Sequence, residues 1–211
     1  GLNPEGVEVH SFKAPSHLEM AHDFLWRHQL VLPELGQIAI FNRSHYENVL
    51  VTRVHPEYIL NENLPGIEKV EDITSEFWET RFEQINNFEK HISENGILIF
   101  KFYLNLSKKE QKNRLRRRLE KQEKNWKFSP GDLKERKLWD KYQFCYEELL
   151  NKTSKEHAPW YIIPADDKPT ARLIVAKTIL NCLKGYNFKE PDLPIKYQAE
   201  IENYKEELNN E

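Results

Sequence analysis

A short polar run follows an apolar one in the first quarter of the chain. Ile38–Phe41 is continuous and apolar, and the six residues from Asn42 to Glu47 all carry side chains that donate or accept hydrogen bonds. Arg43 supplies a guanidinium, which is the preferred group for bidentate contact with phosphate. Glu47 lies four residues later, so it either pairs with Arg43, holds a magnesium ion or orients a phosphate acceptor. The run predicts phosphate chemistry, with a structural Arg43–carboxylate pair as the alternative.

Positive charge is concentrated in one segment, although the whole chain has a net charge of −3. Residues 101–128 contain eleven Lys or Arg and three Glu, a net charge of +8. A basic segment in an otherwise acidic protein predicts a polyanionic partner: nucleic acid, nucleotide phosphates or an inorganic polyanion. The alternative is a solvated helix held by ion pairs at i,i+4 spacing, a spacing shared by Glu110–Arg114, Arg116–Glu120 and Glu120–Lys124.

Four cations of this segment lie on one helical face, namely Arg114, Arg117, Arg118 and Lys121. Only Leu115 and Leu119 supply an apolar seam, so we expect this helix to project from the core. A projecting cationic helix suits a lid that closes over phosphates and excludes water. Lys127 follows between two aromatic residues, at the hinge or floor of that lid.

The surrounding elements alternate between strand and helix patterns. Strands are predicted at 7–12, 38–41, 96–104 and 160–163, and helices after Ser16, Ser44, Thr74, Ser107 and Ser129 and across 169–183. This order predicts an α/β sandwich with a parallel sheet, whose ligands bind beyond the carboxyl ends of the strands. The polar run and the basic segment both follow a strand, so we expect them at one edge of the sheet.

Several kinds of protein and site are excluded by pattern. Two distant cysteines without a CxxC pair exclude a disulfide scaffold and a thiolate zinc site, and they favour a reducing cytosol. No HExxH metal motif is present, and His22 and His28 are interpreted as structural. No apolar run is long enough to span a membrane. The seven glycines form no GxxxxGK[ST] phosphate loop.

Five motifs, in order and at natural spacing, resemble the family-2 polyphosphate kinases from about Gly1 to Lys184. They are Ser11–Pro15, His22–Arg27, Phe41–Glu47, Trp126–Pro130 and His157–Tyr161. The resemblance implies the three-layer α/β/α sandwich of P-loop kinases with a helical lid at about 107–128. It also implies transfer of a terminal phosphoryl group between inorganic polyphosphate and AMP or ADP, with Mg²⁺.

The resemblance also implies roles for individual residues. Asn42 and Arg43 match the end of a Walker B-like strand, and with Glu47 they are the candidate catalytic residues. Arg114, Arg117, Arg118 and Lys127 are the candidate polyphosphate contacts, Asp23 and Arg27 are the candidate nucleotide contacts, and metal ligands are unassigned. Further expected partners are ATP, the guanine nucleotides GMP and GDP, and a second copy of the chain. No nucleic acid or membrane partner is expected.

One departure from the family concerns its Walker A loop, which precedes the segment that starts here. The strand before that loop is central in the family's sheet, and a sheet without it exposes two edges. We therefore expect an N-terminally incomplete domain over residues 1–188, followed by an acidic tail at 189–211. Because the loop supplies both positioning and charge stabilisation, catalysis by this chain alone is in question.

Two other functions remain open at this point. An ATP-dependent P-loop kinase would use the basic helix as an ordinary lid, and dependence on polyphosphate separates it from the first hypothesis. A catalytically incomplete polyanion-binding fragment would bind in a strongly salt-dependent way and ignore nucleotides. RNA is the weakest ligand for such a fragment, because only Trp126 supplies a stacking surface near the basic helix.

Overall fold

The computed structural model describes residues 4–186, 193–198 and 200–210. The chain divides into two compact units, Gly1–Ala171 and Arg172–Glu211. All four strands belong to the first unit. The expected boundary between residues 188 and 189 lies outside the described residues. Among the residues that are described, no helix is both long enough and apolar enough to cross a membrane.

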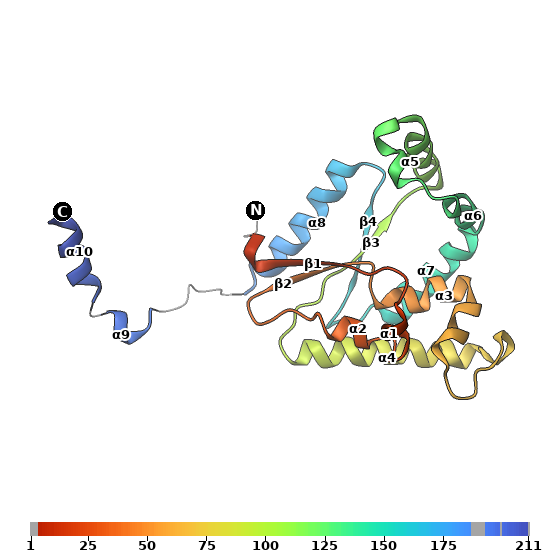
Figure 1. Ribbon diagram of the computed structural model, residues 1–211, viewed down its shortest axis with the longest axis horizontal. Coiled ribbons are helices and arrows are strands. Elements are labelled where there is room, and N and C mark those ends of the chain that lie inside the picture. Colours follow the sequence, from red (N-terminus) through yellow and green to blue (C-terminus); the bar gives the residue numbers. More distant parts are fainter. Residues whose placement is uncertain (1–3, 187–192, 199, 211) are drawn as a thin grey trace. The chain divides into compact units, whose positions relative to one another are not determined.

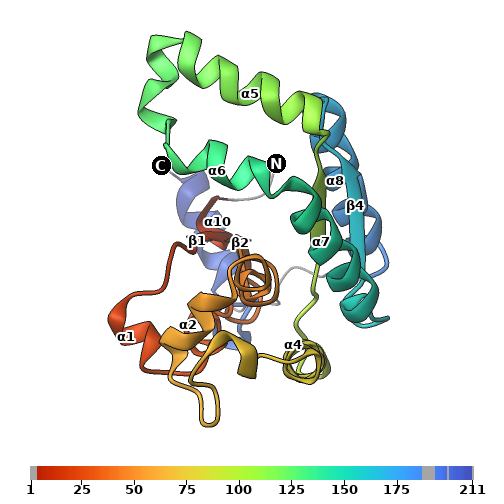
Figure 2. The same cartoon turned by 90° about the vertical axis from the view of Figure 1, so that its right-hand side faces the viewer.

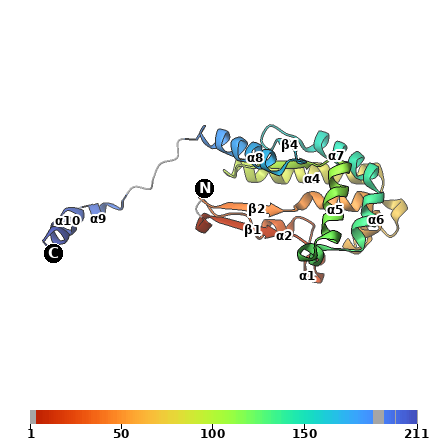
Figure 3. The same cartoon turned by 90° about the horizontal axis from the view of Figure 1, so that it is seen from above.

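The strands form two separate parallel pairs (Figure 1). In the first pair, β1 (Val7–Ser11) lies beside β2 (Ile38–Asn42), with Val9 opposite Ile40. In the second pair, β3 (Lys101–Asn105) lies beside β4 (Trp160–Pro164). The predicted parallel direction is therefore confirmed. Because β2 and β3 end on the side where the basic helix lies, the polar run and the basic segment share that side (Figures 1 and 3).

The four described strands do not form one continuous sheet, and the expected sheet without its central strand would likewise leave two strand edges unpaired. Figures 2 and 3 both place β2 and β3 as the inner strands of the two pairs, yet no ladder joins them. The first pair is also partly bare on one face, where Val9 is 63% exposed and Ile40 is 46% exposed. Parallel strands normally occur in sheets buried on both faces, so this exposed face of the first pair is unusual.

The first predicted helix is broken in two. Ser16 and Glu19 form the expected capping box, which starts α1 (His17–Met20). The helix ends at Ala21, and α2 (Trp26–Gln29) begins after a turn in which the Asp23 carboxylate accepts a hydrogen bond from the Leu25 amide. An Asp side chain that binds a nearby backbone amide favours a turn over a continued helix. This local competition overrides the helical spacing of the apolar residues.

The core of the first unit lies where three helical segments meet. After β2, Ser44 caps the 3₁₀ segment η2 (His45–Val49), which leads into α3 (Val51–Val54). These pack on α4 (Ser75–Glu94) and α7 (Trp139–Thr153). The fully buried members of the cluster are apolar residues from each segment: Tyr46, Val49, Leu50, Val54, Phe82, Ile85, Cys145 and Leu149. Further 3₁₀ turns lie at Pro4–Gly6 (η1), Pro56–Glu62 (η3) and Val70–Asp72 (η4).

The basic segment forms a hairpin of helices that projects as expected. Ser107 accepts a hydrogen bond from the Glu110 amide and starts α5 (Lys108–Glu120), in which no residue is buried. The chain turns through η5 (Gln122–Lys127) and returns along α6 (Gly131–Lys137) (Figure 2). We call residues 107–137 the lid hairpin. The single helix predicted after Ser129 is wrong in one respect, because it breaks at Leu138 between α6 and α7.

The second unit is helical where it is described. Helix α8 (Lys168–Leu183) matches the prediction for 169–183 and enters this unit from the first. Two shorter helices follow, α9 (Ile195–Gln198) and α10 (Ile201–Asn209). The predicted helical character of the acidic tail is confirmed for these residues.

Candidate functional site

Arg43 stands at the end of β2 in an unusual backbone conformation. Its φ angle is +63°, in the left-handed region that few residues other than glycine adopt. Such a conformation costs about 1–2 kcal/mol for a residue with a Cβ. Asn42 precedes it and donates from its amide to the Ser11 hydroxyl at 3.4 Å. The turn leaves Arg43 exposed beyond the strand, where a guanidinium can meet a ligand.

Glu47 lies half-buried one turn after Arg43. Burial raises the pKa of its carboxyl, and the nearby positive charges of Arg43 and Arg27 oppose that rise. No hydrogen bond to its side chain is present in the described part of the chain. From α7, the tyrosines Tyr142 and Tyr146 lie close enough for the charge of Glu47 to raise their pKa values, after the larger effect of burial. Glu47 is therefore a carboxylate with unused acceptor capacity.

The two predicted nucleotide contacts already have intramolecular partners. Arg27 donates to the Lys13 carbonyl at 3.0 Å, lies 3.6 Å from Glu19 and covers the Phe12 ring. Asp23 is exposed, and one of its oxygens accepts from the Leu25 amide at 2.9 Å. The charge of Arg27 opposes the rise in the pKa of Glu47. The charge of Asp23 instead opposes the lowering of the pKa of Arg81 by burial. Their roles toward a nucleotide stay predictions.

A buried charge network supports η2 from below. The Lys101 ammonium donates to Glu89 at 2.6 Å, to the Tyr46 hydroxyl at 2.7 Å and to the Thr153 carbonyl at 2.8 Å. Tyr46 in turn donates to Glu89 at 2.7 Å, and His45 lies 3.2 Å from the same carboxylate. Burial works to raise the pKa of Glu89, but His45 and Lys101 hold it below its ordinary value. Two residues of the polar run are thus fixed from α4, β3 and α7.

The neighbouring His28 is a core residue, as expected. Its side chain is 2% exposed and lies against Phe12 and His45. Burial, followed by the charges of His45 and Arg27, lowers its pKa to about 3. At neutral pH it therefore packs as an uncharged ring.

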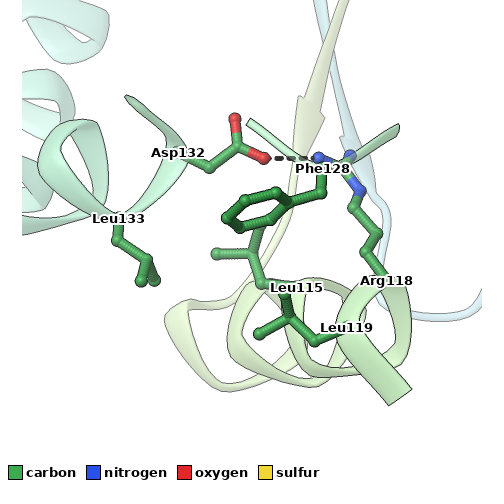
Figure 4. A pocket seen from close by; sticks show the side chains of 6 residues that line it. All are labelled: Leu115, Arg118, Leu119, Phe128, Asp132 and Leu133. Carbon is green, nitrogen blue, oxygen red and sulfur yellow. Dashed lines mark hydrogen bonds and ion pairs between the residues drawn. The ribbon is translucent and has the colours of Figure 1, made fainter. Parts of the chain in front are cut away.

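The lid arginines differ in how far their donors are already used. Arg114 donates to Glu110 at 2.9 Å and to the Ala165 carbonyl at 2.7 Å, which ties α5 to the end of β4. Arg118 donates to Asp132 at 2.8 Å, across a small apolar pocket between α5 and α6 (Figure 4). The other residues that line this pocket are Leu115, Leu119, Phe128 and Leu133. Arg114 thus attaches α5 to the end of β4, and Arg118 joins the two helices of the lid hairpin.

Arg117 and Lys127 present their charges outward. Both side chains are exposed. Lys127 lies over the ring of Trp126, which is itself 78% exposed. The ion-pair alternative is confirmed for Glu110–Arg114 and Arg116–Glu120, while no Glu120–Lys124 pair forms in the described chain. The basic helix thus combines internal pairs with outward cations.

Two positions show what sequence reasoning missed. Glu89 lies on the apolar face of α4, and Lys101 lies within an apolar strand. A charge in each apolar pattern is a signal of a partner in the core, although α4 also buries Arg81, so the pattern alone does not say which charges pair. The contacts of Tyr142 had no such signal, because they depend on how α7 packs.

The described residues contain no cluster of three or more His, Cys, Asp or Glu side chains that could hold a metal ion. Glu47 is one carboxylate with free acceptor sites at the strand end, and the Asn42 amide oxygen lies on the same turn. Mg²⁺ is often held by one or two carboxylates together with substrate phosphates. This donor set fits an ion shared with a phosphate ligand, and it does not fit a closed protein site.

The chain is similar to curated phosphotransferases along nearly its whole length. It is 45% identical over 208 residues to the ADP-polyphosphate phosphotransferase of Rhodopseudomonas palustris, covering 99% of this chain and 71% of that protein. It is 42% identical over 191 residues to the AMP/ADP-polyphosphate phosphotransferase of Meiothermus ruber, covering 90% of this chain and 66% of that one. This chain therefore spans about two thirds of each relative.

A solved structure and a family model agree with these relatives. The crystal structure of polyphosphate kinase 2 from Arthrobacter aurescens TC1 superposes with a TM-score of 0.85 at 39% identity, covering 97% of this chain and 67% of that one. The model of the family described as Polyphosphate kinase 2 (PPK2) matches residues 1–191. By its match to the family model and its similarity to this solved structure, this chain belongs to the polyphosphate kinase 2 family.

Proposed function

We propose that this chain moves a terminal phosphoryl group between inorganic polyphosphate and AMP or ADP. The observation that carries the proposal is the family match over residues 1–191, whose relatives are named for ADP or for AMP and ADP. The chain is accordingly a polyphosphate-dependent nucleotide phosphotransferase. An exposed Arg43 and a cationic lid hairpin on the same side of the unit suit this chemistry.

The reaction requires positioning and charge stabilisation more than covalent chemistry by the protein. The bond between the terminal phosphorus and its bridging oxygen breaks, and a phosphate oxygen of the nucleotide forms the new bond. Arg43 donates two N–H groups to the transferring phosphoryl group in this proposal. Glu47, between the charges of Arg43 and Arg27, orients the guanidinium and the accepting phosphate.

The lid hairpin binds the polyphosphate chain in this proposal. Arg117 and Lys127 make the first contacts because their side chains are exposed. Arg114 and Arg118 contribute charge while Arg114 keeps its contact with the end of β4 and Arg118 keeps its contact across the lid hairpin. Asp23 and Arg27 contact the nucleotide in this proposal. Arg27 is the better placed of the two, because it is near enough to Glu47 for its charge to affect the pKa of that carboxyl.

Mg²⁺ is the divalent ion of this proposal. Glu47 and the Asn42 amide oxygen are the protein groups that would hold it, together with phosphate oxygens of the substrate. The ion supplies neutralisation of charge on the transferring group. The remaining charge stabilisation comes from Arg43 and the lid hairpin.

We also propose that the two strand pairs are halves of one three-layer α/β/α sandwich. A further parallel strand between β2 and β3, carrying a phosphate-binding loop, would join them. The support for the strand is that β2 and β3 are the inner strands of two unjoined pairs, and the exposed faces of Val9 and Ile40 support a further covering layer. In this proposal such a strand comes from outside these 211 residues.

The remaining parts of the proposal concern the setting. ATP is the product when ADP accepts, and GMP and GDP are further acceptors. Cys145 and Cys182 are free thiols, which supports a cytoplasmic location. A homo-oligomer is expected for the completed domain.

The decisive experiment is nucleotide chromatography after incubation with Mg²⁺, polyphosphate and either AMP or ADP. This chain is compared with a longer form that restores a strand and a phosphate-binding loop. We expect the longer form to make ADP or ATP, and this chain to make much less. Salt-dependent polyphosphate binding without product from either form would favour the binding-only function instead.

A pair of lid variants tests which cations meet polyphosphate. Arg117→Ala should weaken polyphosphate binding about tenfold, the effect of one charge-assisted contact, and leave nucleotide binding nearly unchanged. Arg116→Ala is the matched control, because it removes the same charge from the same helix but from a residue paired with Glu120. Equal losses for the two variants, measured by calorimetric titration, would contradict the role of Arg117.

A further inference from the structure

Glu135 on α6 connects the lid hairpin to the core. One of its carboxylate oxygens accepts from the Tyr142 hydroxyl at 2.7 Å and lies 3.0 Å from the His55 Nε2 atom. Tyr142 belongs to α7 and His55 follows α3, so both partners belong to the core. Burial works to raise the pKa of Glu135, but these two hydrogen bonds outweigh it and hold that pKa below its ordinary value.

The adjacent residues complete the attachment. Arg136 donates to the Lys108 carbonyl and to the Gln111 side chain, so it joins α6 to the base of α5. Consecutive side chains on α6 therefore join it to the core on one side and to the cationic helix on the other.

Tyr142 also relates this attachment to the strand end. Its hydroxyl binds Glu135, and its pKa is raised by the charge of Glu47 as well as by that of Glu135. The same tyrosine thus lies near both the lid anchor and the polar run.

We infer that Glu135 is a positioning residue, which sets the lid hairpin at a fixed place relative to the strand end so that its cations meet polyphosphate. Only the identity of the ligand, polyphosphate, rests on the proposed function. An acidic side chain in a polyanion-binding lid would otherwise weaken binding by repulsion. Here it strengthens binding, because an ordered lid loses less conformational freedom when the ligand binds.

The first test measures lid order without any ligand. In Glu135→Ala, hydrogen exchange of the α6 amides should become about tenfold faster, as expected when a local contact of this strength is lost. Tyr142→Phe should act in the same direction while leaving the lid sequence intact, and Glu135→Gln should restore most of the protection. Unchanged exchange in both Glu135→Ala and Tyr142→Phe would overturn the inference.

The second test measures polyphosphate affinity by titration. Glu123→Ala is the matched control, because it removes an exposed acid from the turn η5 of the same hairpin. If the two acids act only by repulsion, both variants should bind polyphosphate more tightly. If Glu135 positions the lid hairpin, Glu135→Ala should bind severalfold more weakly, and Glu123→Ala should bind equally well or more tightly. Equal changes in the two variants would overturn the inference. If the unaltered chain binds no polyphosphate, the proposed function fails, and the exchange result still decides whether Glu135 anchors the lid.

Discussion

The loop after β2 (residues 42–47, called the strand-end loop) and the lid hairpin both have positive charge in or around them. The charge around the strand-end loop is buried, whereas the charge of the lid hairpin is exposed. Around the loop, Lys101 is 6% exposed and bonded to Glu89, Tyr46 and Thr153. In the lid hairpin, no residue of α5 is buried, and Arg117 and Lys127 point outward. A buried charge must have all its partners inside the protein, whereas an exposed charge can keep its partners outside.

This difference separates two tasks that phosphoryl transfer needs. The loop holds Arg43 on a frame fixed by a buried network, while the lid hairpin offers charge to a long and variable ligand. Rigid placement suits the transferring phosphoryl group, because catalysis depends on position. Exposed cations on the lid hairpin suit the rest of a polyphosphate chain, because their hydrogen-bond donors stay available to the ligand.

The largest expected effect comes from breaking the buried network. Lys101→Met leaves Glu89 buried without its ammonium partner, and the free energy of unfolding should fall by about 3–5 kcal/mol. Urea denaturation measures the loss. The lid counterpart is Asp132→Asn, which removes the partly exposed partner of Arg118 and should cost less than about 1 kcal/mol.

A double variant sharpens this first prediction. Lys101→Met combined with Glu89→Leu removes both charges, so it should recover much of the stability that Lys101→Met loses. If Lys101→Met costs no more than Asp132→Asn, the contrast between a fixed frame and an exposed lid is wrong.

The second effect concerns pH and His28. Its pKa is lowered from 6.5 to about 3 in the folded chain, so below pH 6.5 the unfolded chain binds a proton that the folded chain does not. Stability must then fall as the pH falls through this window, by up to about 1.4 kcal/mol for each pH unit. His28→Leu should remove this part of the acid sensitivity, as measured by urea unfolding at pH 7 and pH 4. Parallel losses in both proteins would rule out a buried neutral His28.

The smallest effect tests the strained turn. Arg43→Gly should raise the free energy of unfolding by about 1 kcal/mol, because glycine adopts a positive φ without strain. The same change should lower phosphotransfer by the longer form sharply. Asn63→Gly is the control, since Asn63 also has a positive φ of 50° but lies outside the site. Loss of stability in Arg43→Gly would show that its side chain supports the fold.

Local signals in the sequence predicted the elements well. Caps at Ser16 and Ser107 were correct, and the apolar face of α4 ended at Asn95 as expected. These features depend on residues a few positions apart. The break at Asp23 and the split at Leu138 were missed, because apolar spacing continued through both of them.

The candidate site was predictable in location but not in detail. An apolar run followed by Arg43 and Glu47 indicated a strand end, and the structure has one there. The buried pairing of Lys101 with Glu89, and the attachment of Glu135 to His55, connect residues far apart in the sequence. Such pairs depend on packing between elements, which periodicity does not encode. The two unjoined strand pairs agree with the open edges expected for a sheet that lacks its central strand, an expectation that came from the family resemblance and not from periodicity.

The unjoined strands have a further consequence for the self-association of the chain. β2 and β3 each carry an edge of backbone N–H and C=O groups that no other described strand uses. Open edges of this kind recruit strands from other molecules, so crowding turns them into points of self-association. Light scattering of this chain should therefore rise with concentration, and a short β-forming peptide that occupies the edge should suppress it. Solubility thus depends on the same backbone that would align a phosphate-binding strand.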